Sequence, residues 1–312
     1  MTESHKKRPI HRMAAIALLL LFSAGQACRG ADVADTASSP TKGYNCLFLG
    51  HSFFAPIVNN LSDHPARCGF PKHKQTVVFH GGSKGAPGML WASPLPDVAQ
   101  AKKLLESGTV DLLGLTFYPY VGSEVSDYRK WIDLALKHNS KTRFIIQSPW
   151  AIYENKTLAQ YTDDSEKSLK QIHLIIDSLR QAYPGNTILC IPQGRWMAGL
   201  WRLYSGGELP EVAILKRNNP SDKDPCLFLD HIGHGGDIPV KMGALLWLAT
   251  IYQVDLNTYP WKTNTRYDLK KLAQEIIRND PYCGLGSPNA TPPISPPSAP
   301  ATGSINGSHP NF

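Results

Sequence analysis

Five short apolar runs alternate along this sequence with segments of helical periodicity. Continuous apolar runs of this length are typical of strands buried on both faces of a parallel sheet. Strands that alternate with amphipathic helices favour a sheet covered by helices on both of its faces. The sequence therefore predicts an α/β fold on a five-stranded parallel sheet. Its strands are expected at residues 46–49, 75–79, 110–116, 143–147 and 187–191.

The helices are predicted from apolar residues that recur at spacings of three and four. Residues 192–196 follow the fifth strand with no helix predicted there, and residues 205–224 form a polar loop. Helices are expected over residues 53–61, 96–106, 126–138, 164–183, 240–252 and 267–278.

Composition sets the limits of the folded domain. Hydrophobic residues make up 42% of the chain and charged residues 18%, which is ordinary for a globular protein with a sizeable core. Residues 284–312 contain no Asp, Glu, Lys or Arg and are rich in proline, so this tail is expected to be disordered. We therefore predict one folded domain over residues 44–283.

The N-terminus has the pattern of an export signal. Basic residues from Lys6 to Arg12 precede an apolar run that is too short to span a bilayer comfortably, and small residues follow it. We predict a cleaved signal peptide over residues 1–27 and a polar linker over residues 28–43. Lipidation of Cys28 is the alternative, but the leucine usual before such a cysteine is absent. The mature protein is expected to be secreted or periplasmic, without stable membrane insertion.

Export implies an oxidising compartment, in which cysteines form disulfides. Two of the cysteines beyond the leader, Cys46 and Cys190, fall inside predicted strands and fit equally well as small buried apolar residues. The sequence leaves the pairing open. The cysteines concerned are Cys46, Cys68, Cys190, Cys226 and Cys283.

The net charge of +7 does not indicate a nucleic-acid partner. Residues 1–27 hold four basic residues and one acidic residue, so +3 of that charge belongs to the leader. No stripe of Lys and Arg interleaved with aromatic residues follows, as a nucleic-acid interface would have. We expect a small-molecule or carbohydrate substrate as the partner and no nucleic acid, while the oligomeric state stays open.

Ser52 is the first candidate for chemistry. It follows the strand at residues 46–49 and the turn-forming Gly50, where a helix is expected to begin. Open α/β sheets bind their ligands at the carboxyl ends of their strands, and helix N-termini favour negative charge. The alternative is that Ser52 is only the N-cap of that helix.

The second candidate cluster is the segment Asp230-His231-Ile232-Gly233-His234. A serine hydroxyl needs a base to take its proton, and a histidine is the usual base. That histidine in turn needs a carboxylate to hold its tautomer. Both groups are available here from one loop ahead of a helix.

These residues resemble the SGNH (GDSL-like) hydrolases. The similarity comprises Gly50-His51-Ser52 near the N-terminus, glycines after the second strand, and the Asp/His segment before the C-terminal helix. The resemblance implies a three-layer flavodoxin-like sandwich and the activity of an esterase, a lipase or a carbohydrate deacylase. The usual nucleophile block has Asp or Asn where this chain has His51, which we interpret as a surface residue or one that supports the site from behind.

The resemblance also implies a Ser52–His–Asp230 triad. The family commonly has Asp-x-x-His, whereas this chain has Asp230-x-x-x-His234 with His231 next to the aspartate. We assign the base to His234 because it lies nearer the following helix, and His231 remains the alternative.

The oxyanion donors implied by the resemblance are the backbone N–H groups of Ser52 and of a glycine in the 80–88 loop. We choose Gly82, with Gly85 second. The third donor of the family, an asparagine after the third strand, is missing here. Losing one such donor costs about 3–4 kcal/mol of transition-state stabilisation. The candidates to replace it are Gln147, Gln193 and the Tyr118 hydroxyl.

The resulting hypothesis is an exported serine esterase that cleaves ester bonds, including acetyl esters on carbohydrates, and needs no cofactor. Aromatic residues at the strand ends would line its cleft or pack in the core: Trp91, Tyr118, Tyr120, Trp150, Trp196 and Trp201. The alternative is a non-catalytic SGNH-like protein that binds glycans. The third hypothesis is a zinc hydrolase with His80, His231, His234 and Asp237 as ligands.

Overall fold

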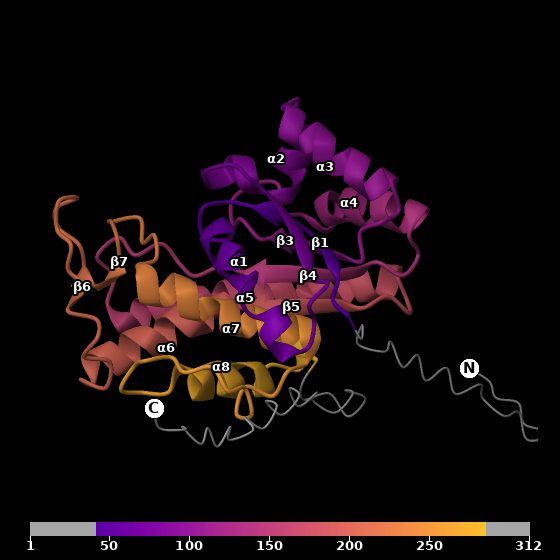
Figure 1. Ribbon diagram of the computed structural model, residues 1–312. Coiled ribbons are helices and arrows are strands. Elements are labelled where there is room, and N and C mark those ends of the chain that lie inside the picture. The colour runs from indigo at the N-terminus through magenta and orange to yellow at the C-terminus, as the bar shows by residue number, and fades with distance from the viewer. Residues whose placement is uncertain (1–41, 285–312) are drawn as a thin grey trace, which may run out of the picture. The chain divides into compact units, whose positions relative to one another are not determined.

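The computed structural model describes residues 42–284 (Figure 1). The predicted signal peptide 1–27, the alternative lipidation site at Cys28, and nearly all of the predicted linker and tail lie outside these residues. Within residues 42–284, no helix has both the length and the apolar character needed to cross a membrane.

A five-stranded parallel sheet forms the centre of the fold, with the strand order β2-β1-β3-β4-β5. This is the flavodoxin-like order. Because β1 lies between β2 and β3, the turn after β1 is flanked by the ends of both neighbours. All five predicted strands are confirmed, with small shifts at their ends: β1 (Asn45–Gly50), β2 (Lys74–Phe79), β3 (Leu112–Thr116), β4 (Arg143–Ser148) and β5 (Ile188–Pro192).

Helices cover both faces of the sheet, as predicted (Figure 1). Alternate residues of β1 enter two separate cores: Leu47 and Leu49 pack on one face, Cys46 and Phe48 on the other. The face of Leu47 is covered by α2 (Pro87–Ala92), α3 (Pro96–Glu106), α4 (Val125–His138) and α5 (Leu158–Ala182). The face of Phe48 is covered by α1 (Ala55–Leu61), α6 (Gln193–Ser205), α7 (Asp237–Tyr252) and α8 (Leu269–Arg278).

Three elements differ from the sequence prediction. Helix α6 occupies a segment where no helix was predicted. The sequence pattern did not reveal it because the helix is buried on nearly every side, lacks a polar face and contains two glycines. Helix α5 starts before the predicted residue 164 because Thr157 and Gln160 form a capping box. A short parallel pair, β6 (Ile214–Lys216) and β7 (Cys226–Phe228), lies partly in the predicted polar loop.

The cysteines of the described chain form no disulfide. All five are free and buried, which agrees with the interpretation of Cys46 and Cys190 as small apolar residues and not with pairing. Burial raises the pKa of the Cys68 thiol to about 12, so this group stays protonated near neutral pH.

Gly114 in β3 provides a test of the core beside β1. A methyl group there would meet the Phe48 ring at 2.5 Å, so Gly114→Ala is expected to lower the free energy of unfolding by about 1–3 kcal/mol. Gly81→Ala is the matched control, since Gly81 has a φ of −63° and open space around it. The control is expected to be neutral or stabilising by up to about 1 kcal/mol in urea denaturation. Equal effects of the two substitutions would contradict this packing.

Candidate active site

Ser52 lies in the turn between β1 and α1. The N-cap of α1 is Phe54, with no side-chain capping bond, so the interpretation of Ser52 as a helix N-cap is wrong. The turn is tight because a Cβ on Gly50 would meet the Phe54 ring at 2.5 Å, which requires glycine at this position. Ser52 is partly exposed, and its hydroxyl is available at the carboxyl end of β1.

A continuous hydrogen-bonded chain joins Ser52, His234 and Asp230. The Ser52 Oγ lies 2.9 Å from His234 Nε2, and His234 Nδ1 lies 2.6 Å from Asp230 Oδ2. With a neutral histidine, Ser52 donates to Nε2 and Nδ1–H donates to the carboxylate, which is the arrangement of a serine nucleophile with its base. The structure thus brings together the three residues that the sequence predicted for this role.

The loop between β7 and α7 fixes the positions of Asp230 and His234 relative to each other. Asp230 Oδ1 accepts from the backbone N–H groups of Gly233 at 2.8 Å and His234 at 3.2 Å, while Gly233 adopts a φ of +102°. Trp150 Nε1–H donates to the Gly233 carbonyl at 2.8 Å and ties this loop to the end of β4. Burial raises the pKa of Asp230, but these hydrogen bonds and the one from the His234 ring lower it overall, which keeps the carboxylate charged.

His231 takes no part in this chain. It is exposed, and among the described residues its ring forms no hydrogen bond; only its backbone carbonyl accepts, from Glu154 N–H at 2.9 Å. His80 pairs with Asp97 at 3.0 Å instead of approaching His234. Over residues 42–284, no three His, Cys, Asp or Glu side chains are placed to hold a metal ion together.

The glycines after β2 differ in their surroundings. Gly85 packs tightly against the end of β1, where a Cβ would meet the Gly50 carbonyl at 2.5 Å and His51 Cβ at 2.6 Å. Gly82 is exposed, has a φ of +58° and begins the 3₁₀-helix Gly82–Gly85, so its N–H has no acceptor within that helix. The role of Gly82 as an oxyanion donor stays a prediction.

The proposed replacements for the missing asparagine have different environments. Gln147 is fully buried, and both ends of its amide are engaged, by Thr116 Oγ1 at 2.8 Å and the Phe53 carbonyl at 3.1 Å. Gln193 is also buried and accepts from Trp247 Nε1 in the core around α7. Tyr118, in contrast, lines the cleft described next.

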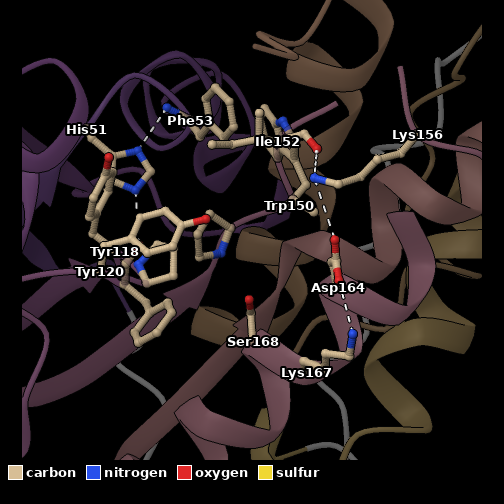
Figure 2. Close-up of a pocket in the computed structure, with 14 residues that line it drawn as sticks. His51, Phe53, Tyr118, Tyr120, Trp150, Ile152, Lys156, Asp164, Lys167 and Ser168 are labelled. Atoms are coloured by element: carbon tan, nitrogen blue, oxygen red, sulfur yellow. Dashed lines mark hydrogen bonds and ion pairs between the residues drawn. The ribbon is translucent and has the colours of Figure 1, made fainter. Parts of the chain in front are cut away.

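A cleft of about 280 Å³ opens beside the candidate triad. Figure 2 shows the side chains that line it. Phe53 separates the two: its ring stacks on Trp150 with centroids 4.7 Å apart and meets the His234 ring edge-on at 5.1 Å. His51, Tyr118 and Tyr120 form the facing wall, and α5 supplies the polar floor. Figure 2 shows the Ser168 hydroxyl pointing into this space, and Asp164 between the two lysines with which it pairs, Lys156 and Lys167.

Three of the six aromatic residues singled out from the sequence line this cleft: Tyr118, Tyr120 and Trp150. The others pack elsewhere. Trp196 and Trp201 are buried in the core, and Trp91 packs edge-on against Trp131. Sequence reasoning did not single out Phe53, an apolar residue at the start of a predicted helix. It also missed the polar residues of α5, because helical periodicity marks them as ordinary helix-surface positions.

His51 is buried, not on the surface. It is 4% exposed, and its ring bonds to the Phe53 N–H and the Phe117 carbonyl, each at 3.1 Å. Burial lowers the pKa of His51 to about 4; the hydrogen bond to Phe117 offsets part of this effect, and the nearby His234 adds to it. His51 is therefore neutral in the folded protein at neutral pH.

Comparison with known proteins gives distant similarity to solved structures only. No protein-family model matches the chain, and no curated protein matches it. A similar solved structure is the periplasmic domain of a lipopolysaccharide acetyltransferase from Salmonella ser. Paratyphi A. The identity is 12% and the TM-score 0.36, over 66% of this chain and 81% of that chain. A similarity at this level does not indicate an activity, so the candidate site rests on its own geometry.

The burial of neutral His51 predicts a pH dependence of stability. The unfolded chain takes up a proton near pH 6.5, whereas the folded protein resists protonation until about pH 4. The stabilisation is therefore complete above pH 6.5 and is lost as the pH falls toward 4, by up to about 3 kcal/mol. His51→Asn, which does not titrate, should show a smaller decrease in urea denaturation over that range. The same pH dependence in both proteins would contradict the assignment.

Proposed function

We propose that this protein is an exported serine esterase of the SGNH type. The observation that carries the proposal is the hydrogen-bonded chain from Ser52 through His234 to Asp230 at the carboxyl end of the sheet. A hydroxyl, an imidazole and a carboxylate in this order are the groups needed to activate a serine nucleophile. The partly exposed position of Ser52 next to a cleft supports access by a substrate.

In the proposed reaction, Ser52 Oγ attacks the ester carbonyl carbon while His234 Nε2 takes the hydroxyl proton. Asp230 stabilises the imidazolium that forms and holds its orientation. Collapse of the tetrahedral intermediate breaks the bond to the leaving alcohol, which receives the proton from His234. Water, deprotonated by His234, then attacks the acyl-Ser52 and releases the carboxylic acid and the free serine.

The negative charge on the carbonyl oxygen needs donors that are in place before the reaction. We assign them to the backbone N–H groups of Ser52 and Gly82. The chain has no asparagine in the segment after β3, and the Gln147 amide, in the neighbouring strand β4, is already engaged at both ends. Of the three candidate replacements, only Tyr118 lines the cleft, so we assign the third donor to its hydroxyl.

We infer that the alcohol part of the ester is a carbohydrate. The cleft combines aromatic rings on two walls with a floor of hydroxyl, carboxylate and ammonium groups. Such a surface suits a sugar, which presents C–H groups to aromatic faces and hydroxyl groups to polar side chains. The predicted export of the chain is consistent with an extracellular or periplasmic polysaccharide as the source.

The nucleophile and base assignments predict a sharp difference between two histidines. Ser52→Ala and His234→Ala should each lower kcat on p-nitrophenyl acetate by at least about 10³-fold. His231→Ala, the matched control on the same loop, should keep kcat within about twofold. The His231 ring is exposed and takes no part in the hydrogen bonds that join Ser52, His234 and Asp230. A fluorophosphonate should add one label to the wild type and none to Ser52→Ala by intact mass. Wild-type turnover that survives Ser52→Ala would refute the mechanism.

The carbohydrate assignment predicts a substrate-dependent effect at Tyr120, which is 76% exposed and so can be replaced without loss of core packing. Tyr120→Ala should raise KM for an acetylated oligosaccharide by about threefold to tenfold, as expected for one lost stacking contact. Its kinetics on p-nitrophenyl acetate should be unchanged. Phe79→Ala, an exposed aromatic residue that does not line the cleft, is the control. Equal KM values for Tyr120→Ala and wild type would argue against a sugar in this cleft.

A non-catalytic glycan-binding protein is the second candidate, supported by the absence of the third oxyanion donor. It predicts that acetylated oligosaccharides bind without turnover. Ser52→Ala would then leave both binding and the lack of turnover unchanged, which separates this candidate from the esterase.

A further inference from the structure

Beneath the turn that carries Ser52 lies a set of buried polar side chains to which the proposed mechanism gives no step. These are His51, Thr116 and Gln147, which are 4%, 0% and 0% exposed. A polar group buried without a partner costs stability, so buried polar groups are hydrogen-bonded in folded proteins.

The hydrogen bonds form a closed ring. Phe53 N–H donates to His51 Nδ1 at 3.1 Å, and Gln147 Nε2–H donates to the Phe53 carbonyl at 3.1 Å. Thr116 Oγ1 donates to Gln147 Oε1 at 2.8 Å and lies 3.3 Å from His51 Nε2. Phe53 thus bonds through both its N–H and its carbonyl, and the ring connects the ends of β1, β3 and β4. We call these four residues, His51, Phe53, Thr116 and Gln147, the His51 network.

The directions of these bonds fix the tautomer of His51. Nδ1 accepts the Phe53 N–H, so it carries no proton. Nε2 faces two oxygen atoms, the Phe117 carbonyl at 3.1 Å and Thr116 Oγ1 at 3.3 Å. Because the Thr116 proton is used on Gln147, both oxygens can only accept, and Nε2 must carry the hydrogen. Every member of the ring is then satisfied with His51 neutral.

The surroundings of His51 favour this neutral form. Its ring packs edge-on against the aromatic rings of Phe53 and Tyr118, each with centroids 5.9 Å apart, and Gly85 closes against its Cβ. The ionisable group that acts on it from across the site is His234, whose positive charge would oppose a second one. A protonated His51 would present N–H to N–H at Phe53 and break the ring.

We propose that the His51 network positions Ser52, with neutral His51 protonated on Nε2 as its central member. The inference rests on the proposed function, since it assigns positioning residues to that reaction. The network holds the residue on each side of Ser52, and so fixes the direction of the Ser52 hydroxyl toward His234 and of the Ser52 N–H toward the substrate. The network also fills the end of β3, where the asparagine donor would be expected. Gln147 therefore donates to the Phe53 carbonyl in the turn and is not free to donate to the oxyanion. The rate of attack by Ser52 depends on a hydroxyl that is held in the reactive position before the reaction.

The first test detects the His51 network by NMR and needs no enzyme assay. In ¹⁵N NMR of the full folded chain, His51 should show a protonated Nε2 and an unprotonated Nδ1 at pH 7, and the Phe53 amide should be strongly protected from hydrogen exchange. A protonated Nδ1, or a Phe53 amide that exchanges like an exposed one, would overturn the proposal. These readouts stand even if p-nitrophenyl acetate is not turned over, a result that would refute the esterase alone.

The second test uses a matched pair at Thr116. Thr116→Val keeps the shape but removes the hydroxyl that bonds to Gln147, whereas Thr116→Ser keeps the hydroxyl. In folded protein, Thr116→Val should lower kcat on p-nitrophenyl acetate about tenfold or more with little change in KM, and should reduce protection of the Phe53 amide. Thr116→Ser should restore both. A folded Thr116→Val with wild-type kcat would overturn the positioning role, because a purely structural bond changes stability and not kcat. Should Thr116→Val not fold, the NMR test of the wild-type protein decides the question.

Discussion

The candidate site forms where it does because β1 lies between β2 and β3 in the sheet. All strands run in parallel, so their carboxyl ends meet at one edge of the sheet. The turn after a central strand has neighbours on both sides, here the glycine loop after β2 and the segment after β3. Ser52 can therefore be reached by groups from several strand ends at once, which an edge strand would not allow.

Burial beneath this turn makes hydrogen bonding obligatory. The turn leaves helix and strand geometry between Gly50 and Ala55, and its backbone groups need partners that regular structure does not supply. His51 and Gln147 provide them for Phe53, while Trp150 provides one for the Gly233 carbonyl on the opposite loop. The two halves of the candidate triad are thus held by separate side-chain bonds to the ends of the same sheet.

The aromatic rings connect these two supports. Phe53 stacks on Trp150 and packs edge-on against His234, so one ring contacts both the wall of the cleft and the candidate base. Aromatic contacts of this kind contribute about 0.5–1.5 kcal/mol each beyond the area they bury. A substrate seated in the cleft would lie against the same ring that orients the imidazole, which is a physical route from binding to chemistry.

The sheet, most of the helices and the identity of the candidate groups could be predicted from the sequence. Runs such as residues 46–49 report burial on both faces, and Asp230 and His234 lie on one loop, so both conclusions depend only on local sequence. The tertiary structure decided which histidine meets Ser52, that His51 is buried, that Gln147 is engaged, and that α6 is a helix. Ser52 and His234 are 182 positions apart in the chain. Periodicity reveals which side of an element is buried but not what it is buried against, so such a pairing becomes visible only when the strand ends are assembled.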